Sequence, residues 1–215
     1  MFAPSLIASK AEFSRAPAEE VWIPMRKILV YCLLASGLMA ADLRPLRVAP
    51  GPGTRFTLEV EKTGLMSGKK HVFLFERYSG ILQLDQANPE KSSIQLEIEA
   101  RSAVLKDDWV SAKDARKIAD YAQMEMMNSA KFPLLKFVST TITARGNGVY
   151  DVQGNLTIRD ITKPVLVMVT EKSGVCEGKA TVKLSDYKLK PVSALLGAIG
   201  TKNEMTVGFV LRPGT

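Results

Sequence analysis

The chain has 215 residues, of which 46% are hydrophobic and 24% are charged, a composition that is typical of one globular domain and excludes a multi-span membrane protein. The formal net charge of +7 comes from basic residues that are scattered along the chain, without an RRM-like, KH-like or zinc-finger pattern. We therefore interpret the charge as a solvated basic surface and expect no nucleic-acid partner.

Residues 25–41 have the pattern of a secretory signal peptide. A short positive region, Met25-Arg26-Lys27, precedes an apolar run that is too short to span a bilayer as a helix, and Ala40-Ala41 supplies small residues for cleavage. We interpret residues 1–24 as an N-terminal extension or a mis-assigned start. We expect 42–215 to form the mature domain, periplasmic or secreted in a bacterium, without a stable membrane span.

Three strands with a period of two are expected next. The first is Thr54–Lys62, in which aromatic and aliphatic residues alternate with charged ones. Along His71–Leu84 the apolar residues move from odd to even positions near Glu76-Arg77, which predicts a bulge within one long strand. The third strand is Ser92–Arg101.

Residues 111–128 change to a helical period. Ser111 followed by Asp114 predicts a capping box at the start of a helix. Small and aliphatic residues then recur on one stripe at helical spacing, beginning with Ala115 and Ile118. The sequence therefore predicts one helix over about 111–128, inserted after the third strand.

Five more strands follow the helix, and the clearest is Tyr150–Arg159, in which every residue alternates. A turn at Asp160–Pro164 and the apolar run Val165–Val169 complete a hairpin. The other strands are Leu134–Ala144, Val175–Leu184 and Glu204–Leu211, with an apolar loop at 187–202 before the last of them. The fold class is therefore all-β: eight strands with one inserted helix predict a nearly closed antiparallel barrel, which has room for packed side chains or for one elongated ligand.

Few residues suit catalysis. His71 is the only histidine, no G-x-S-x-G motif occurs, and we interpret His71 as a solvated residue at the rim of the barrel. Asp107-Asp108 is interpreted as part of a solvated loop, since glycosidase carboxylates lie apart across a cleft. Cleavage of the leader would leave Cys176 as the only cysteine, without a disulfide, and we interpret it as a small core residue. We expect no metal, no cofactor and no catalytic residues.

Several segments, in the same order, resemble the YceI-like family of periplasmic polyisoprenoid-binding barrels. The resemblance covers roughly residues 46–213. The hairpin is similar to the family's GxLTIxGxTKPV motif. The matching segments are Phe56-Thr-Leu-Glu-Val60 with Gly64, Tyr78-Ser-Gly-Ile81 with Leu84-Asp85 and Asn88-Pro89, Lys131-Phe-Pro133 with Phe137-Val-Ser-Thr140, and Gly154-Asn-Leu-Thr-Ile158 with Thr162-Lys-Pro-Val165.

The resemblance implies a lipocalin-like barrel that binds a long isoprenoid lipid, an isoprenoid quinone or a polyprenyl compound such as a prenyl diphosphate. Asp160 and Phe73 stand where the family commonly has glycine, so we expect a different turn at Asp160 and a cavity narrowed by Phe73. The residues that we expect to line the cavity are Phe56, Leu58, Phe73, Phe75, Leu82, Leu96, Phe137, Leu156, Val182 and Phe209. Three basic residues near the apolar loop are expected to meet a phosphate or quinone head group at the mouth: Lys188, Lys190 and Lys202.

Other interpretations stay open from the sequence alone. The lining residues could instead fill a solid core, as in a structural or stress-related envelope protein, and the three lysines could be ordinary surface residues. A hydrolase or isomerase could use the same pocket for a small apolar substrate. A homodimer is also left open.

Overall fold

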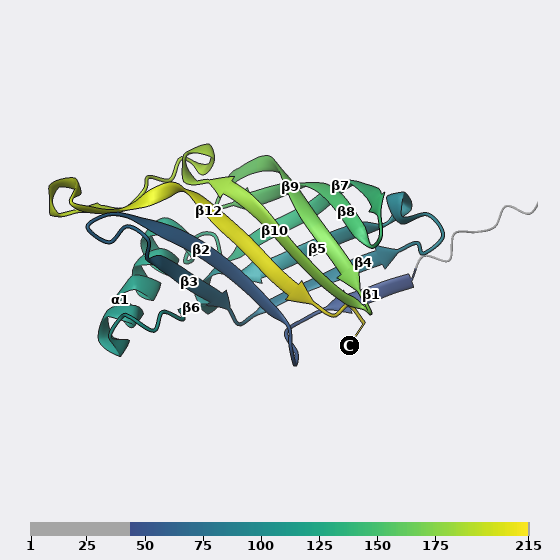
Figure 1. Ribbon diagram of the computed structural model, residues 1–215, viewed down its shortest axis with the longest axis horizontal. Helices are drawn as coiled ribbons and strands as arrows, with labels where there is room; N and C mark the ends of the chain where they lie inside the picture. The colour runs from purple at the N-terminus through teal and green to yellow at the C-terminus, as the bar shows by residue number, and fades with distance from the viewer. Residues whose placement is uncertain (1–43, 215) are drawn as a thin grey trace, which may run out of the picture. The chain divides into compact units, whose positions relative to one another are not determined.

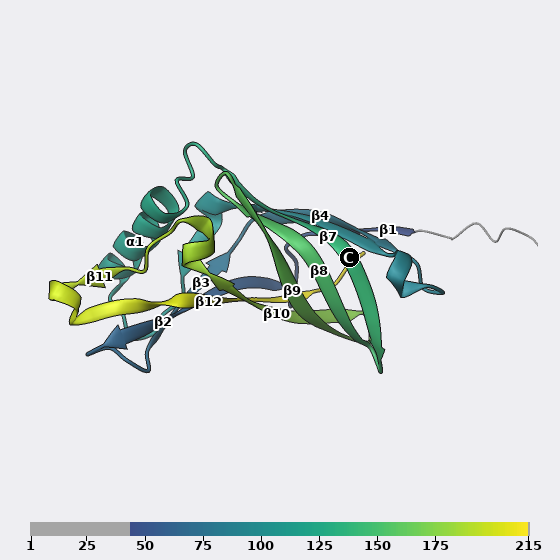
Figure 2. The same ribbon diagram turned by 90° about the horizontal axis from the view of Figure 1, so that it is seen from above.

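The computed structural model describes residues 44–214 (Figure 1). The predictions of an N-terminal extension at 1–24 and of a signal peptide at 25–41 lie outside the described residues. The described part of the chain forms one antiparallel sheet that curls around an apolar interior, with a single short α-helix at one end (Figures 1 and 2). This confirms the predicted fold class.

The sheet contains twelve strands among the described residues, whereas the sequence predicts eight. The hydrogen-bonded order is β1-β4-β5-β7-β8-β9-β10-β12-β2-β3-β6, with β11 beside β12. The bounds are β1 Arg44–Val48, β2 Arg55–Gly64, β3 Lys70–Phe75, β4 Tyr78–Leu84, β5 Ser93–Glu99, β6 Ala103–Leu105, β7 Leu134–Gly146, β8 Val149–Ile158, β9 Ile161–Lys172, β10 Val175–Lys183, β11 Ser193–Ala194 and β12 Ile199–Leu211.

Two of the four additional strands among the described residues arise from a corner that divides one long hairpin into two halves. The predicted strand His71–Leu84 is β3 and β4, and at Glu76-Arg77 the chain turns a corner where we expected a bulge. At this corner the Glu76 amide donates to the Ser102 carbonyl at 3.1 Å, and the Glu99 amide donates to the Arg77 carbonyl at 3.0 Å. Beyond it, β3 pairs with β2 and β6, whereas β4 pairs with β1 and β5. Because β3 continues covalently into β4, the wall of the barrel continues across this corner from the sheet region that contains β2 and β3 to the region that contains β4 and β5.

Other strands also differ from the prediction: β1 was not expected, and β9 Ile161–Lys172 is longer at both ends than the predicted run Val165–Val169. β1 is an edge strand that contains Pro45, and its five residues are too few to show a clear alternation. β12 begins at Ile199 instead of Glu204. Its pairing with β2 shifts register between Thr201 and Met205, and such an irregularity interrupts the period of two by which strands are recognised.

The hairpin predicted at Tyr150–Val169 forms strands β8 and β9. Ile158 pairs with Ile161, so the turn has only two residues, Arg159 and Asp160. Arg159 holds the positive φ of 59°, and Asp160 is not among the residues with positive φ. A glycine at position 160 is therefore not needed for this turn.

The predicted helix is α1 Ala112–Tyr121, continued by the π-helical turn η4 Ala122–Met126. Ser111 caps the helix as predicted, since the Asp114 amide donates to Ser111 Oγ at 3.1 Å, but the Asp114 carboxylate accepts from Ser111 Oγ at 2.8 Å instead of from the Ser111 amide that a full capping box would use. Ala115 and Ile118 pack against the main core cluster, which fixes the helix beside β6 (Figure 1). Within residues 44–214, four short 3₁₀ helices lie in connections: η2 Pro89–Lys91, η3 Ala100–Ser102, η5 Leu184–Tyr187 and η6 Leu195–Gly197.

Candidate functional site

The interior of the barrel contains a cavity of about 580 Å³, which is within the range of small-molecule sites. Its walls come from strands on every side of the barrel, and most of the lining side chains are aliphatic or aromatic. Their inward direction follows from the alternation of strand residues between the two faces of the sheet. The interior is therefore hollow, in contrast to the alternative of a barrel packed solid.

Nine of the ten residues that the sequence predicts for the cavity lie in its wall. Phe73 does not: it is buried on β3, and its ring centroid lies 6.4 Å from that of His71. Phe73 therefore does not narrow the cavity. The nine lining residues are Phe56, Leu58, Phe75, Leu82, Leu96, Phe137, Leu156, Val182 and Phe209.

Two glycines allow aromatic rings to lie flat against the inner wall. A Cβ atom at Gly178 would lie 2.2 Å from Cζ of Phe209, its cross-strand partner, and a Cβ atom at Gly154 would lie 2.4 Å from Cζ of Phe137. Both distances are far below van der Waals contact. These glycines therefore keep the two rings along the wall.

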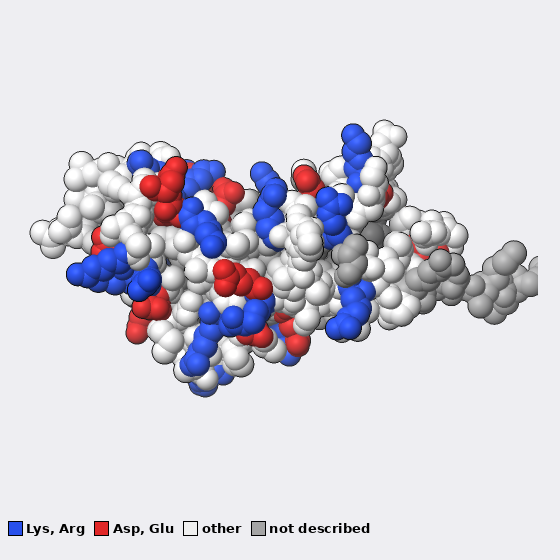
Figure 3. Space-filling model, turned by 90° about the horizontal axis from the view of Figure 1, so that it is seen from below, with Lys and Arg blue, Asp and Glu red and all other residues white. Residues whose placement is uncertain are grey.

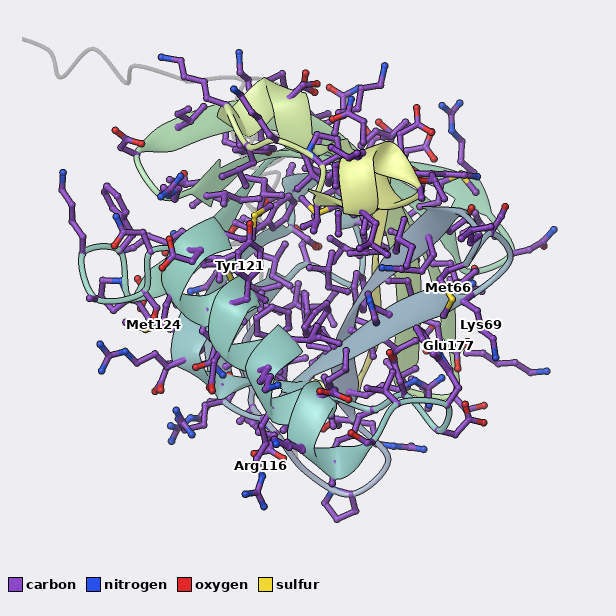
Figure 4. The ribbon with its side chains drawn as sticks, turned by 90° about the vertical axis from the view of Figure 1, so that its left-hand side faces the viewer. Met66, Lys69, Arg116, Tyr121, Met124 and Glu177 are labelled. Carbon is purple, nitrogen blue, oxygen red and sulfur yellow. The ribbon has the colours of Figure 1, made fainter. Side chains whose placement is uncertain are left out.

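One end of the barrel is closed by a second apolar cluster around Tyr187. Tyr187 is 1% exposed, and its hydroxyl donates to the Leu156 carbonyl at 3.3 Å. Burial, together with the charge of Asp186, raises the pKa of Tyr187 to about 12, so its hydroxyl stays protonated at neutral pH. Figure 4 views the molecule from this end, where α1 with Arg116 and Tyr121 lies on one side and Met66 and Lys69 lie on the other.

The polar residues of the cavity wall gather at the opposite end. Asp85, Gln86 and Ser92 belong to the connection between β4 and β5, and Glu171 lies at the turn between β9 and β10. Gln86 is exposed and also lines the cavity. We therefore identify this end as the mouth, which is at the right-hand side of Figure 1, near the C-terminus.

The three lysines that were expected at the mouth lie elsewhere. Lys188, Lys190 and Lys202 are absent from the cavity wall, and they are close to the Tyr187 cluster in the chain or at the start of β12. Lys202 forms an ion pair with Glu61 on β2, which raises the pKa of the lysine and lowers that of the glutamate. The sequence shows that these lysines flank an apolar loop, but it does not show at which end of the barrel the loop lies. In the structure, loop 187–202 lies at the closed end.

His71 and Asp107 differ from their expected roles as solvated residues. His71 is 7% exposed, and its Nδ1 lies 2.6 Å from Asp107 Oδ2, whose side chain is fully buried. Asp107 Oδ1 accepts from the Val72 amide at 2.8 Å, and the Trp109 ring stacks on His71 with centroids 5.2 Å apart. This pair joins β3 to the segment that leads into α1. Ser111, which lies near this pair in the sequence, caps helix α1 with its side chain.

Cys176 lines the cavity near the mouth and is half-buried. Burial and then the nearby charge of Glu171 raise the pKa of this thiol, which makes it a poor nucleophile at neutral pH. Between residues 44 and 214, no group of three or more His, Cys, Asp or Glu side chains is arranged to hold a metal ion. No helix in the described range is long and apolar enough to cross a membrane.

The outer surface carries basic and acidic side chains that are interspersed, as Figure 3 shows for one face. Several of them form ion pairs between neighbouring strands, such as Lys136 with Glu97 at 2.7 Å and Lys70 with Glu59 at 3.1 Å. This distribution agrees with the interpretation of the net charge as a solvated surface.

Comparisons with known proteins agree with this architecture. The model of the YceI-like domain matches residues 53–212, more than half of the chain. UPF0312 proteins of Pseudomonas savastanoi pv. phaseolicola and Pseudomonas fluorescens are 29% identical over 131 residues and 31% identical over 127 residues. Each match covers 54% of this chain and 62% of the relative, so the similarity spans less than two thirds of the length of these relatives.

Solved structures show the same fold. The crystal structure of Burkholderia cenocepacia BcnA aligns with a TM-score of 0.58 at 20% identity, over 74% of this chain and 94% of that chain. The YCEI protein of Campylobacter jejuni aligns with a TM-score of 0.51 at 16% identity, over 66% of this chain and 83% of that chain. With the extent of the family match and the hollow antiparallel barrel, these findings show that the chain belongs to the YceI-like family.

Proposed function

We propose that the protein binds a long isoprenoid lipid, of the quinone or polyprenyl type, inside the barrel and holds or carries it outside the cytoplasm without catalysis. The observation that carries this proposal is the cavity of about 580 Å³ with an almost entirely apolar wall. Membership of the YceI-like family supports the isoprenoid class. The signal-peptide pattern at 25–41 supports a periplasmic or secreted location.

The energetics of burial are sufficient for such a role. Each buried CH₂ contributes about 0.8 kcal/mol. A dozen buried carbons therefore supply roughly 10 kcal/mol, and after a cost of about 4 kcal/mol for association roughly 6 kcal/mol remains, which corresponds to a Kd on the order of 10⁻⁵ M. The pre-formed cavity lowers that cost further because the protein side needs little rearrangement.

The test is to identify what the purified protein contains. We expect organic extraction of the full chain, followed by mass spectrometry, to give an isoprenoid at a ratio near one per protein molecule. If the protein is purified without lipid, we expect an added isoprenoid quinone or prenyl alcohol to bind. A protein that is empty and that binds neither compound would contradict the proposal.

Cys176 provides a second readout at the cavity itself. It lines the wall near the mouth, so a bound lipid should slow its modification by a small thiol reagent at mildly alkaline pH. Peptide mass spectrometry separates Cys176 from Cys32, the other cysteine of the chain. An equal rate of Cys176 modification with and without bound lipid would place the lipid outside the cavity.

A further inference from the structure

The polar groups in the wall of the cavity are all hydrogen-bond acceptors or neutral groups. Two carboxylates, Asp85 and Glu171, and four neutral hydroxyl or amide side chains, Thr57, Gln86, Ser92 and Tyr150, line it. Within the described range, no lysine or arginine lines the cavity. The negative charge of Glu171 already acts on the nearby thiol of Cys176, whose pKa it helps to raise. The mouth is therefore poorly suited to an anionic head group.

Asp85 has one carboxylate oxygen in use and one without a partner. The Asn88 amide donates to Oδ1 at 2.8 Å, and the Asp85 amide donates to Ser92 Oγ at 2.9 Å. These bonds fix the residue at the end of β4. Asp85 is 3% exposed, and its Oδ2 is buried without a hydrogen-bond partner among the described residues. A buried carboxylate oxygen that lacks a donor is unfavourable, so most such groups in proteins are satisfied.

Two other polar groups of the cavity wall have hydrogen-bond partners of their own. Glu171 Oε1 accepts from the Gly174 amide at 2.8 Å, which closes the turn between β9 and β10. The Thr57 hydroxyl donates to the Gly208 carbonyl at 3.2 Å. Within the described range, Asp85 Oδ2 is a buried side-chain oxygen of a wall residue that has no hydrogen-bond partner, and a ligand that bonds to it must displace the atoms that cover it.

We propose that Asp85 selects lipids whose head group is a hydroxyl, such as a prenyl alcohol, over the corresponding diphosphates. This inference rests on the proposed function, because it concerns the head group of the same bound lipid. A carboxylate oxygen accepts hydrogen bonds, so it favours a head group that donates one. A diphosphate would instead bring negative charge beside Asp85 and Glu171, where the apolar surroundings screen the repulsion weakly.

The test compares three compounds with the same C20 chain: geranylgeraniol, its methyl ether and geranylgeranyl diphosphate. We expect the alcohol to bind the full-length protein about 10-fold more tightly than the methyl ether, which lacks the donor, as measured by protection of Cys176 or by calorimetry. We expect the diphosphate to bind more weakly than the alcohol. Equal affinities, or tightest binding of the diphosphate, would overturn the inference and leave the proposed function intact. Failure of all three compounds to bind would also overturn the inference, whereas the proposed function is tested separately by the extraction and by binding of an isoprenoid quinone.

Asp85→Asn gives the sharper comparison because it is nearly isosteric. The amide oxygen can still accept from the Asn88 amide, whereas the NH₂ group replaces the unpaired oxygen with a donor. We expect the ratio of alcohol to ether affinity to fall to about one or below. The matched control is Asp120→Asn, the same change at an exposed position of α1, which should keep the wild-type ratio. A wild-type ratio in Asp85→Asn would contradict the role of Asp85.

Discussion

Leu195 and Leu196 adopt a backbone conformation that is costly for their residue type. Their φ angles are 51° and 56°, in the left-handed region, where the Cβ atom of an L-residue crowds the following carbonyl. Leu196 is fully exposed, so its side chain gains nothing from burial in the described domain. The strain at this tip is therefore not compensated by packing of the side chain.

Replacing Leu196 with asparagine should stabilise the domain. Asparagine tolerates the left-handed region because its short side chain bonds locally, and we expect the free energy of unfolding to rise by about 1 kcal/mol. Urea unfolding followed by circular dichroism measures the change. Leu65→Asn is the matched control, since Leu65 is 80% exposed but is not among the residues with positive φ. An equal gain in both variants would show that lower surface hydrophobicity, and not backbone strain, is responsible.

Single residues show how far the sequence can identify a site. The alternation along strands placed Phe56, Leu96 and Phe137 on the inner face, and the cavity wall contains them. Asp85 escaped notice because an aspartate beside Asn88-Pro89 looks like an ordinary turn residue. The burial of Asp85 and the lack of a partner for its Oδ2 are properties of the folded barrel, and no local sequence pattern reveals them.

At the scale of secondary-structure elements, the buried pair of His71 and Asp107 ties β3 to the entrance of α1. Asp107 accepts hydrogen bonds through both oxygens, from the Val72 amide and from His71 Nδ1. The Trp109 indole donates to the Lys70 carbonyl at 3.3 Å and stacks on His71, so the connection is held on both sides. Helix α1 itself is short, and short helices depend on such tertiary contacts for stability.

Asp107→Ala should therefore destabilise the domain strongly. Removal of one member of a buried pair leaves the other without a partner, and we expect a loss of about 3 kcal/mol at neutral pH. Chemical denaturation measures it. The adjacent Asp108→Ala is the control, since Asp108 is exposed and should change stability by less than about 0.5 kcal/mol. A small effect at both positions would mean that the contact does not anchor α1.

The elements also show why the sequence predicts strands better than their connections. Regular alternation identified β5, β8 and β10 to within a few residues. The corner at Glu76-Arg77 was detected as a change of phase but interpreted as a bulge. A bulge and a corner leave the same change of phase, and they differ only in the partners of the strand beyond it.

At the scale of the whole molecule, the cavity results from how the barrel is filled. Large side chains close the end around Tyr187, while Gly154 and Gly178 let aromatic rings lie along the wall nearer the mouth. Protein interiors are normally close-packed, so an empty apolar space of this size lowers the stability of the unliganded domain. Binding of an apolar chain would recover those contacts.

A larger side chain inside the cavity should therefore weaken lipid binding without unfolding the domain. Ala180 is a buried wall residue on β10, and Ala180→Phe would occupy space that several methylenes of a lipid need. We expect the affinity for geranylgeraniol to fall at least about 10-fold, while the domain stays folded because the ring enters empty space. Thr181→Phe adds the same ring at the neighbouring exposed position and should bind like the wild type. Unfolding curves of both variants establish that they are folded. Wild-type affinity in a folded Ala180→Phe protein would mean that the lipid does not bind in the barrel.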